Sequence, residues 1–174
     1  MQATPILIAG HRSHGFTIVE VLVALVVLSI GLLGIAKLML FASHANDSAY
    51  LRSQATELAY EMLDTMRANR QAAVLHDYDT AINVVPSSPG SCVGIATGCG
   101  AAQLALYDVY SWKQRLAAPT GSLPAGQGSV VTSNTTPETA TITVLWDDSA
   151  AQQVFAGTPA GAQAPMAITL ETVL

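Results

Sequence analysis

One carboxylate, Glu20, interrupts an otherwise apolar run of twenty-one residues between Phe16 and Ala36. A lone charge inside the hydrocarbon of a membrane costs about 2.5–3.5 kcal/mol on insertion scales, and such a residue normally has a partner. We therefore expect that some partner compensates the Glu20 carboxylate. The alternative is that Glu20, about one helical turn into the run, reaches water at the membrane interface.

A small residue, Gly15, stands directly before this apolar run, and no Ala-x-Ala-like cleavage site follows it. A secretory signal peptide has a shorter apolar region that ends at such a site, so the chain does not fit that pattern. Processing at Gly15 would instead leave the whole apolar helix on the mature protein.

The apolar run places these residues in a membrane. As a helix, it is long enough to cross about 30 Å of hydrocarbon. Only 11% of all residues are charged, well below the roughly 25% of a typical soluble domain. Arg12 precedes the run with no acidic residue near it, which predicts a cytoplasmic N-terminus. The sequence thus predicts a single-pass membrane protein whose N-terminus is cytoplasmic and whose remaining part lies on the other side of the membrane.

Two cysteines, Cys92 and Cys99, lie in a stretch rich in proline, serine, glycine and threonine, where a loop is expected. In an oxidising compartment, two thiols of the same chain at this spacing would form a disulfide. That disulfide would stabilise the fold by about 2.5 kcal/mol on a loop-entropy estimate. A zinc site is disfavoured because no histidine or further cysteine lies nearby.

An amphipathic helix is predicted over residues 41–76, directly after the apolar run. Apolar residues recur there at steps of three and four, with charged residues between them. No proline occurs between Pro5 and Pro86, so the two segments can form one continuous helix of about 55 residues. The apolar stripe of the second segment consists of Leu51, Ala55, Leu58, Met62 and Met66.

Residues 77–174 are predicted to form a small head. A helix over 101–118, stopped by Pro119, would carry Ala105, Val109, Trp112 and Leu116 on one face. Strands are predicted over 129–133, 139–146 and 166–173. An antiparallel sheet packed on the amphipathic helix would bury both apolar faces, so the expected fold class is α+β, with Trp112 and Trp146 as core aromatic residues.

The head offers little for catalysis or for binding nucleic acid. All four histidines precede residue 77, which excludes a Ser/His/Asp or Cys/His arrangement in the head. The seven acidic and two basic residues from Asp77 onward account for the whole formal net charge of −5. No basic groove is therefore available for phosphates. We predict no enzyme activity, no cofactor, no small-molecule substrate and no nucleic-acid partner.

Two clusters of acidic residues in the sequence have structural explanations. His76, Asp77 and Asp79 form at most a weak metal cluster, and a solvated junction between helix and loop explains them better. Asp147 and Asp148 follow a predicted strand, where a turn explains them better than a pair of catalytic carboxylates does. We therefore predict no metal site.

The stretch GFTIVEVL, from Gly15 to Leu22, resembles the processing site of type IV prepilins, where a leader ending in glycine is followed by phenylalanine and then by glutamate. The resemblance implies that a prepilin peptidase of the inner membrane cleaves between Gly15 and Phe16 and methylates the new amino group of Phe16. It also implies that Phe16 and Glu20 form the assembly contact, because Glu20 would pair with the N-terminal amine of a neighbouring subunit. Residues 1–15 would be the leader, and residues 16–40 the transmembrane and filament-core helix. The protein would then lie in the inner membrane, with residues 77–174 as a periplasmic head.

Three stretches of the head resemble the minor pilins called type IV pilus modification protein PilV. They are DVYSWKQRL from Asp108, LPAGQGSV from Leu123 and VLWDD from Val144. The resemblance implies a low-abundance type IV pilin that joins other minor pilins and the major pilin. Such a subunit would promote pilus assembly in a priming complex and lie near the tip of the fibre.

Two other functions remain open from the sequence. A pseudopilin of a type II secretion system would share the processing site and the helix but serve a short periplasmic piston. A membrane-tethered periplasmic adhesive or binding module would use the helix only as a tether. That second alternative predicts no cleavage at Gly15 and no assembly defect when Glu20 is neutralised.

Overall fold

The computed structural model describes residues 15–92, 98–117, 122–136, 138–149 and 164–174. The chain divides into two compact units, Met1–Leu40 and Phe41–Leu174. Of the predicted leader, only Gly15 is among the described residues, and residues 1–14 lie outside them.

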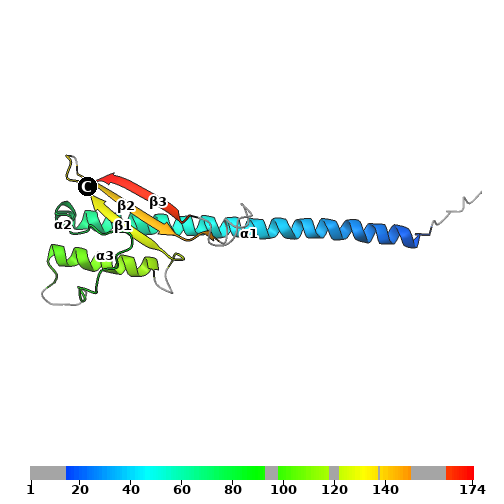
Figure 1. Ribbon diagram of the computed structural model, residues 1–174, viewed down its shortest axis with the longest axis horizontal. Coiled ribbons are helices and arrows are strands. Elements are labelled where there is room, and N and C mark those ends of the chain that lie inside the picture. The colour runs from blue at the N-terminus through cyan, green and yellow to red at the C-terminus, as the bar shows by residue number, and fades with distance from the viewer. Residues whose placement is uncertain (1–14, 93–97, 118–121, 137, 150–163) are drawn as a thin grey trace, which may run out of the picture. The chain divides into compact units, whose positions relative to one another are not determined.

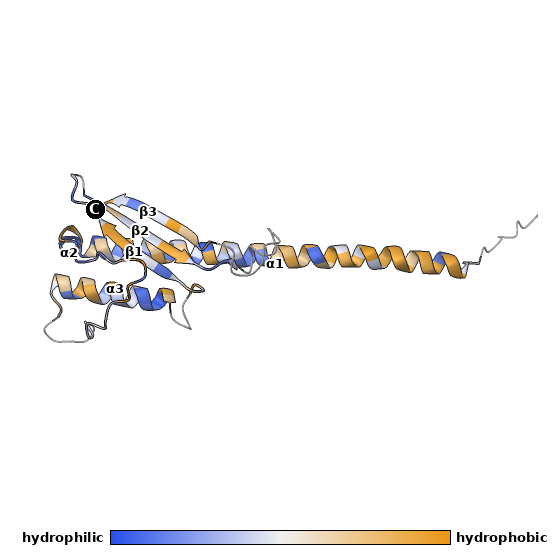
Figure 2. Ribbon diagram, in the orientation of Figure 1, coloured by the Kyte–Doolittle hydropathy of each residue, from blue (hydrophilic) through white to orange (hydrophobic). Residues whose placement is uncertain are grey.

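The described part of the first unit consists mainly of the N-terminal part of helix α1 (Ile18–Ala68). Every described residue up to Leu40 is exposed, and Figure 2 shows this part of α1 as almost uniformly hydrophobic. α1 is long and apolar enough to cross a membrane, and no residue of its most apolar stretch is buried. An exposed apolar surface of this extent needs lipid or protein around it.

In the second unit, α1 buries one side against the head. Ala55, Leu58, Met62 and Met66 are buried and Leu51 is partly buried, which confirms the predicted apolar stripe. The spacing of these residues by three and four places them on one face of the helix, as the core requires.

The long helix ends earlier than residue 76, the end that the sequence predicted. α1 stops at Ala68, and a short helix, α2 (Arg70–Val74), follows. Between them, Asn69 has non-helical backbone angles, with φ −116° and ψ 51°. Its side-chain amide donates hydrogen bonds to the Ala101 carbonyl at 2.8 Å and to the Tyr78 hydroxyl at 3.3 Å. These distant partners, which local periodicity does not show, accompany the break.

Helix α3 (Ala101–Ala117) packs on the same core. It buries Ala105, Val109, Trp112 and Leu116, which confirms the predicted face. The Trp112 indole N–H donates to the Leu58 carbonyl of α1 at 2.9 Å. This bond satisfies a buried donor and ties α3 to α1. The predicted helix end at 118 and its stop at Pro119 lie outside the described residues.

The remaining elements form a three-stranded antiparallel sheet in the order β1 (Gln127–Thr132), β2 (Thr139–Trp146) and β3 (Met166–Val173). Ile142, at the centre of the middle strand, lies opposite Val130 and Leu170. Figure 1 shows the sheet lying along the C-terminal part of α1. Side chains on the inner face alternate with outward ones, and the buried members are Val130, Ala140, Ile142, Val144 and Trp146. The α+β class predicted from the sequence is confirmed, as is the core position of Trp112 and Trp146.

Strand β1 begins at Gln127, two residues before its predicted start. The glycines at this end of the strand lie close to helix α3. A Cβ atom on Gly128 would lie 2.3 Å from the Trp112 ring and 2.7 Å from a Leu116 methyl group. A Cβ on Gly126 would lie 2.2 Å from the Leu116 carbonyl oxygen. Strand and helix α3 therefore approach closely only where a side chain is missing.

We expect Gly128→Ala to destabilise the second unit by about 1–3 kcal/mol, because the added methyl group must displace two fully buried side chains. Urea unfolding of the full chain in detergent, followed by fluorescence, measures this effect, since both tryptophans lie in the second unit. Gly100→Ala is the matched control because a Cβ there meets nothing within 4 Å. Equal midpoints for the two variants would contradict the packing role of Gly128.

Candidate functional site

Thr17 caps the N-terminus of α1. Its hydroxyl oxygen accepts a hydrogen bond from the Glu20 backbone N–H at 3.2 Å, which satisfies one N–H of the first turn. The Glu20 carboxylate also lies in that turn, where the helix dipole favours negative charge. The sequence prediction of the site omitted Thr17, although the Thr-x-x-Glu spacing is the sequence pattern of such a cap.

Phe16 and Glu20 line one shallow hollow of about 320 Å³ on the surface of the first unit. Phe16 is 82% exposed. Elsewhere in this apolar segment, the Ser29 hydroxyl donates to the Leu25 carbonyl at 2.7 Å. The Glu20 carboxylate, by contrast, has neither a hydrogen bond nor an ion pair with any residue that the structure describes. Within the apolar run 16–36, Glu20 is thus a charged residue for which the described residues supply no partner.

Cys92 and Cys99 form the expected disulfide, with their Cα atoms 5.6 Å apart. The bond closes a loop whose two cysteines are seven positions apart, before α3 begins. Its place on the chain indicates a structural role, namely restricting the connection that leads into α3.

Asp108 lies in a hydrogen-bond network between α3 and the end of α1. The buried Tyr78 hydroxyl donates to Asp108 Oδ2 at 2.8 Å. Burial raises the pKa of the Asp108 carboxyl above its ordinary value, although the Tyr78 hydrogen bond and the Arg115 charge oppose this shift. Burial likewise raises the pKa of Tyr78. With Asn69, these residues hold the junction of α1 and α3 together, which is a structural task.

Lys113 is a buried residue that the sequence analysis did not recognise as buried. It is 2% exposed, and its ammonium donates to the carbonyls of Ala81 at 2.6 Å and Ile82 at 3.4 Å. Burial lowers the pKa of this lysine to about 8. Its position, four residues after Val109 and three before Leu116, is the sequence pattern that places it on the buried side of α3.

We expect the second unit to become more stable between about pH 8 and pH 10. In that interval the unfolded lysine, with a pKa near 10.5, keeps a proton that folded Lys113 has released, so raising the pH favours the folded state. The full effect is on the order of 3 kcal/mol. Above about pH 10, ionisation of Tyr78 in the unfolded chain acts in the opposite direction, because its folded pKa is raised.

Urea unfolding at pH 7.5 and pH 9.5 measures this dependence. Lys113→Met should remove the rise, whereas Arg115→Gln, two positions along the same helix, should keep it because a guanidinium does not titrate in this range. A rise of the same size in Lys113→Met would show that another group is responsible.

The acidic groups considered in the sequence have neighbours of their own. The ring of His76 contacts the side chains of Thr132 and Asn134, and Asp79 accepts hydrogen bonds from Thr132. Within the described ranges, no group of three His, Cys, Asp or Glu residues could hold a metal ion. Of the pair Asp147 and Asp148, Asp148 is buried and accepts a hydrogen bond from the Ser48 hydroxyl of α1 at 2.6 Å. The sequence did not predict this contact.

Two family models match the chain. The Prokaryotic N-terminal methylation motif matches residues 10–36, and Type IV pilin Tt1218 matches residues 38–110. The first match contains Gly15, Phe16 and Glu20, and the second contains the amphipathic part of α1, the disulfide and most of α3. These matches support a type IV pilin. Searches of curated proteins and of solved structures gave no match.

The pilin assignment agrees with the fold and with the first unit. Pilin families are structural proteins, so the chain is not an enzyme. The exposed apolar part of α1 fits the membrane anchor of a type IV pilin. Neither match extends beyond residue 110, so the sheet and most of the stretches that resemble PilV lie outside both.

Proposed function

We propose that this type IV pilin is a minor, low-abundance subunit of the PilV kind that promotes pilus assembly together with other minor pilins and the major pilin. The observation that carries the proposal is the Glu20 carboxylate, which has no partner among the described residues and lines the same hollow as exposed Phe16. Both residues lie in a segment that matches the N-terminal methylation motif. The PilV assignment rests on the resemblance of the three head stretches.

In this proposal, prepilin peptidase removes residues 1–15 and methylates Phe16. The new amine of Phe16 in one subunit then pairs with Glu20 of its neighbour. Such a pair is strong where water is excluded, because opposite charges attract more at low dielectric. It would also relieve the cost of placing Glu20 among apolar side chains. Residues 16–40 would act first as the membrane helix and then as filament core.

The head would lie in the periplasm before assembly and near the fibre tip afterwards. A cytoplasmic N-terminus follows from Arg12 on the positive-inside rule, and a disulfide between Cys92 and Cys99 suits an oxidising compartment. The head would select which subunits sit beside this one, whereas helix packing in the membrane supplies the association.

Deletion of the gene, combined with quantitative mass spectrometry of fibres sheared from the wild-type cells, tests the proposal. We expect the subunit in sheared fibres at a small fraction of the major pilin, and markedly fewer surface fibres after deletion. Unimpaired piliation with a loss of type II secretion would instead identify a secretion pseudopilin. Absence from fibres with both processes intact would favour a tethered periplasmic module.

A further inference from the structure

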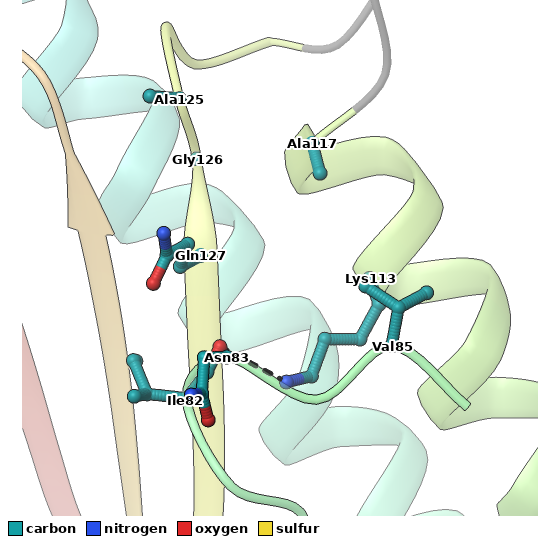
Figure 3. A pocket seen from close by; sticks show the side chains of 8 residues that line it. All are labelled: Ile82, Asn83, Val85, Lys113, Ala117, Ala125, Gly126 and Gln127. Atoms are coloured by element: carbon teal, nitrogen blue, oxygen red, sulfur yellow. Dashed lines mark hydrogen bonds between the residues drawn. The ribbon is translucent and has the colours of Figure 1, made fainter.

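A pocket of about 260 Å³ lies beside α3 in the second unit. Figure 3 shows Lys113 extending from α3 toward the Ile82–Asn83 backbone, with Ala125, Gly126 and Gln127 lining the β1 side. Ile82, Val85 and Ala117 give the pocket mostly apolar walls. It is smaller than the roughly 300–1,000 Å³ of most ligand sites, so it suits a single side chain better than a metabolite.

The charge of Lys113 has no carboxylate counterpart in the described part of the chain. Its ammonium carries three N–H donors, and two of them point at carbonyl oxygens of Ala81 and Ile82. A lysine that is 2% exposed is normally paired with an anion, because an unpaired buried charge is costly. This pairing is missing among the described ion pairs.

Three acidic side chains of the head already accept hydrogen bonds within this subunit. Asp108 accepts from Tyr78, Asp148 accepts from Ser48, and Asp79 accepts from Thr132. Each of these bonds would have to break before its carboxylate could reach Lys113. A counter-ion supplied from outside the subunit needs no such rearrangement.

We propose that this pocket receives an aspartate or glutamate side chain of a neighbouring subunit, whose carboxylate pairs with the Lys113 ammonium. The apolar walls would cover the methylene groups of the incoming side chain while its carboxylate meets the charge. A desolvated pair of this kind favours one partner and one register, since an uncharged residue in its place would leave Lys113 unpaired. The inference rests on the proposed function, because it requires that the subunit assembles.

Carbodiimide cross-linking of sheared fibres tests this contact. The reagent joins an activated carboxyl to an adjacent amine as an amide, with loss of water. Lys113 is the only lysine after residue 40, so its cross-linked peptides are readily assigned by mass spectrometry. Arg115→Lys is the positive control because position 115 contacts Glu61 of the same subunit and should give an internal link.

We expect an amide between Lys113 and an acidic residue of another subunit in fibres, but not in the detergent-solubilised monomer, and no such link in Lys113→Arg. An internal Lys113 link, or no Lys113 link in fibres where the Arg115→Lys control reacts, would overturn the proposal. A free carboxylic acid as occupant gives the second of these results. Absence of the subunit from fibres is a different failure, because it removes the proposed function and this contact with it.

Discussion

A Glu20→Gln variant is expected to enter fibres at least about tenfold less than the wild-type subunit, although its cellular level stays normal. Glutamine keeps the size and the polar end of the side chain but cannot form an ion pair with an N-terminal amine. A hydrogen bond to a charged group is worth about 1.5–3 kcal/mol, and its loss corresponds to roughly tenfold or more. The described residues offer Glu20 no partner within the subunit, so the effect should appear in assembly and not in folding.

Quantitative mass spectrometry of sheared fibres and membranes from the same cells measures this ratio. Glu57→Gln is the matched control, because Glu57 is exposed on the same helix and accepts a long hydrogen bond, 3.4 Å, from the Gln54 amide. Glu20→Asp should recover part of the incorporation. Wild-type incorporation of Glu20→Gln would mean that Glu20 simply reaches interfacial water.

Trp112→Ala is expected to destabilise the second unit by about 3–5 kcal/mol, the usual cost of removing a large buried aromatic side chain. Trp112 is 1% exposed, and its indole N–H bonds the Leu58 carbonyl of α1. The substitution therefore leaves a cavity between α1, α3 and β1 and removes a hydrogen bond between two helices. Because whole domains are stable by only about 5–15 kcal/mol, the variant should unfold at much lower urea concentration.

Urea titration of the full chain in detergent, read from the fluorescence of the remaining Trp146, measures the change. Leu106→Ala, at an exposed position of the same helix, should cost far less. Trp112→Phe should fall between the two, since it keeps an aromatic ring in the core but loses the indole donor and part of the buried area. If Trp112→Ala were as stable as Leu106→Ala, the assigned core would be wrong.

The spacing of apolar residues was enough to predict the helices and strands whose buried face follows a regular pattern. The alternation of Ile142, Val144 and Trp146 identified β2, and Val109, Trp112 and Leu116 identified the buried side of α3. The apolar run identified the exposed first unit. Each of these predictions depends only on spacing along one element.

Features that depend on contacts between distant segments were not predictable in this way. Asn69 is a weak helix breaker, and its hydrogen bond to Ala101 joins residues 32 positions apart. In the sequence, Gly126 and Gly128 look like turn residues. Only the approach of α3, which the sequence does not show, explains why a side chain is excluded at these positions. Sequence spacing places Lys113 on the buried face, but a lysine in that position is ordinarily assigned to the surface.

The candidate site itself was predicted from Gly15, Phe16 and Glu20, since these residues form one short local pattern that the methylation motif covers. The structure adds Thr17 as the helix cap and the absence of a described partner for Glu20. A neighbouring subunit is not part of a single chain, so neither the sequence nor the fold of one subunit contains the other half of this contact.

The most direct test of the central claim is mass spectrometry of the N-terminus of the protein isolated from membranes, with and without prepilin peptidase. The account predicts a mature chain that begins at methylated Phe16 and appears only when the peptidase is present. An intact leader, or cleavage at a position other than the Gly15–Phe16 bond, would contradict it.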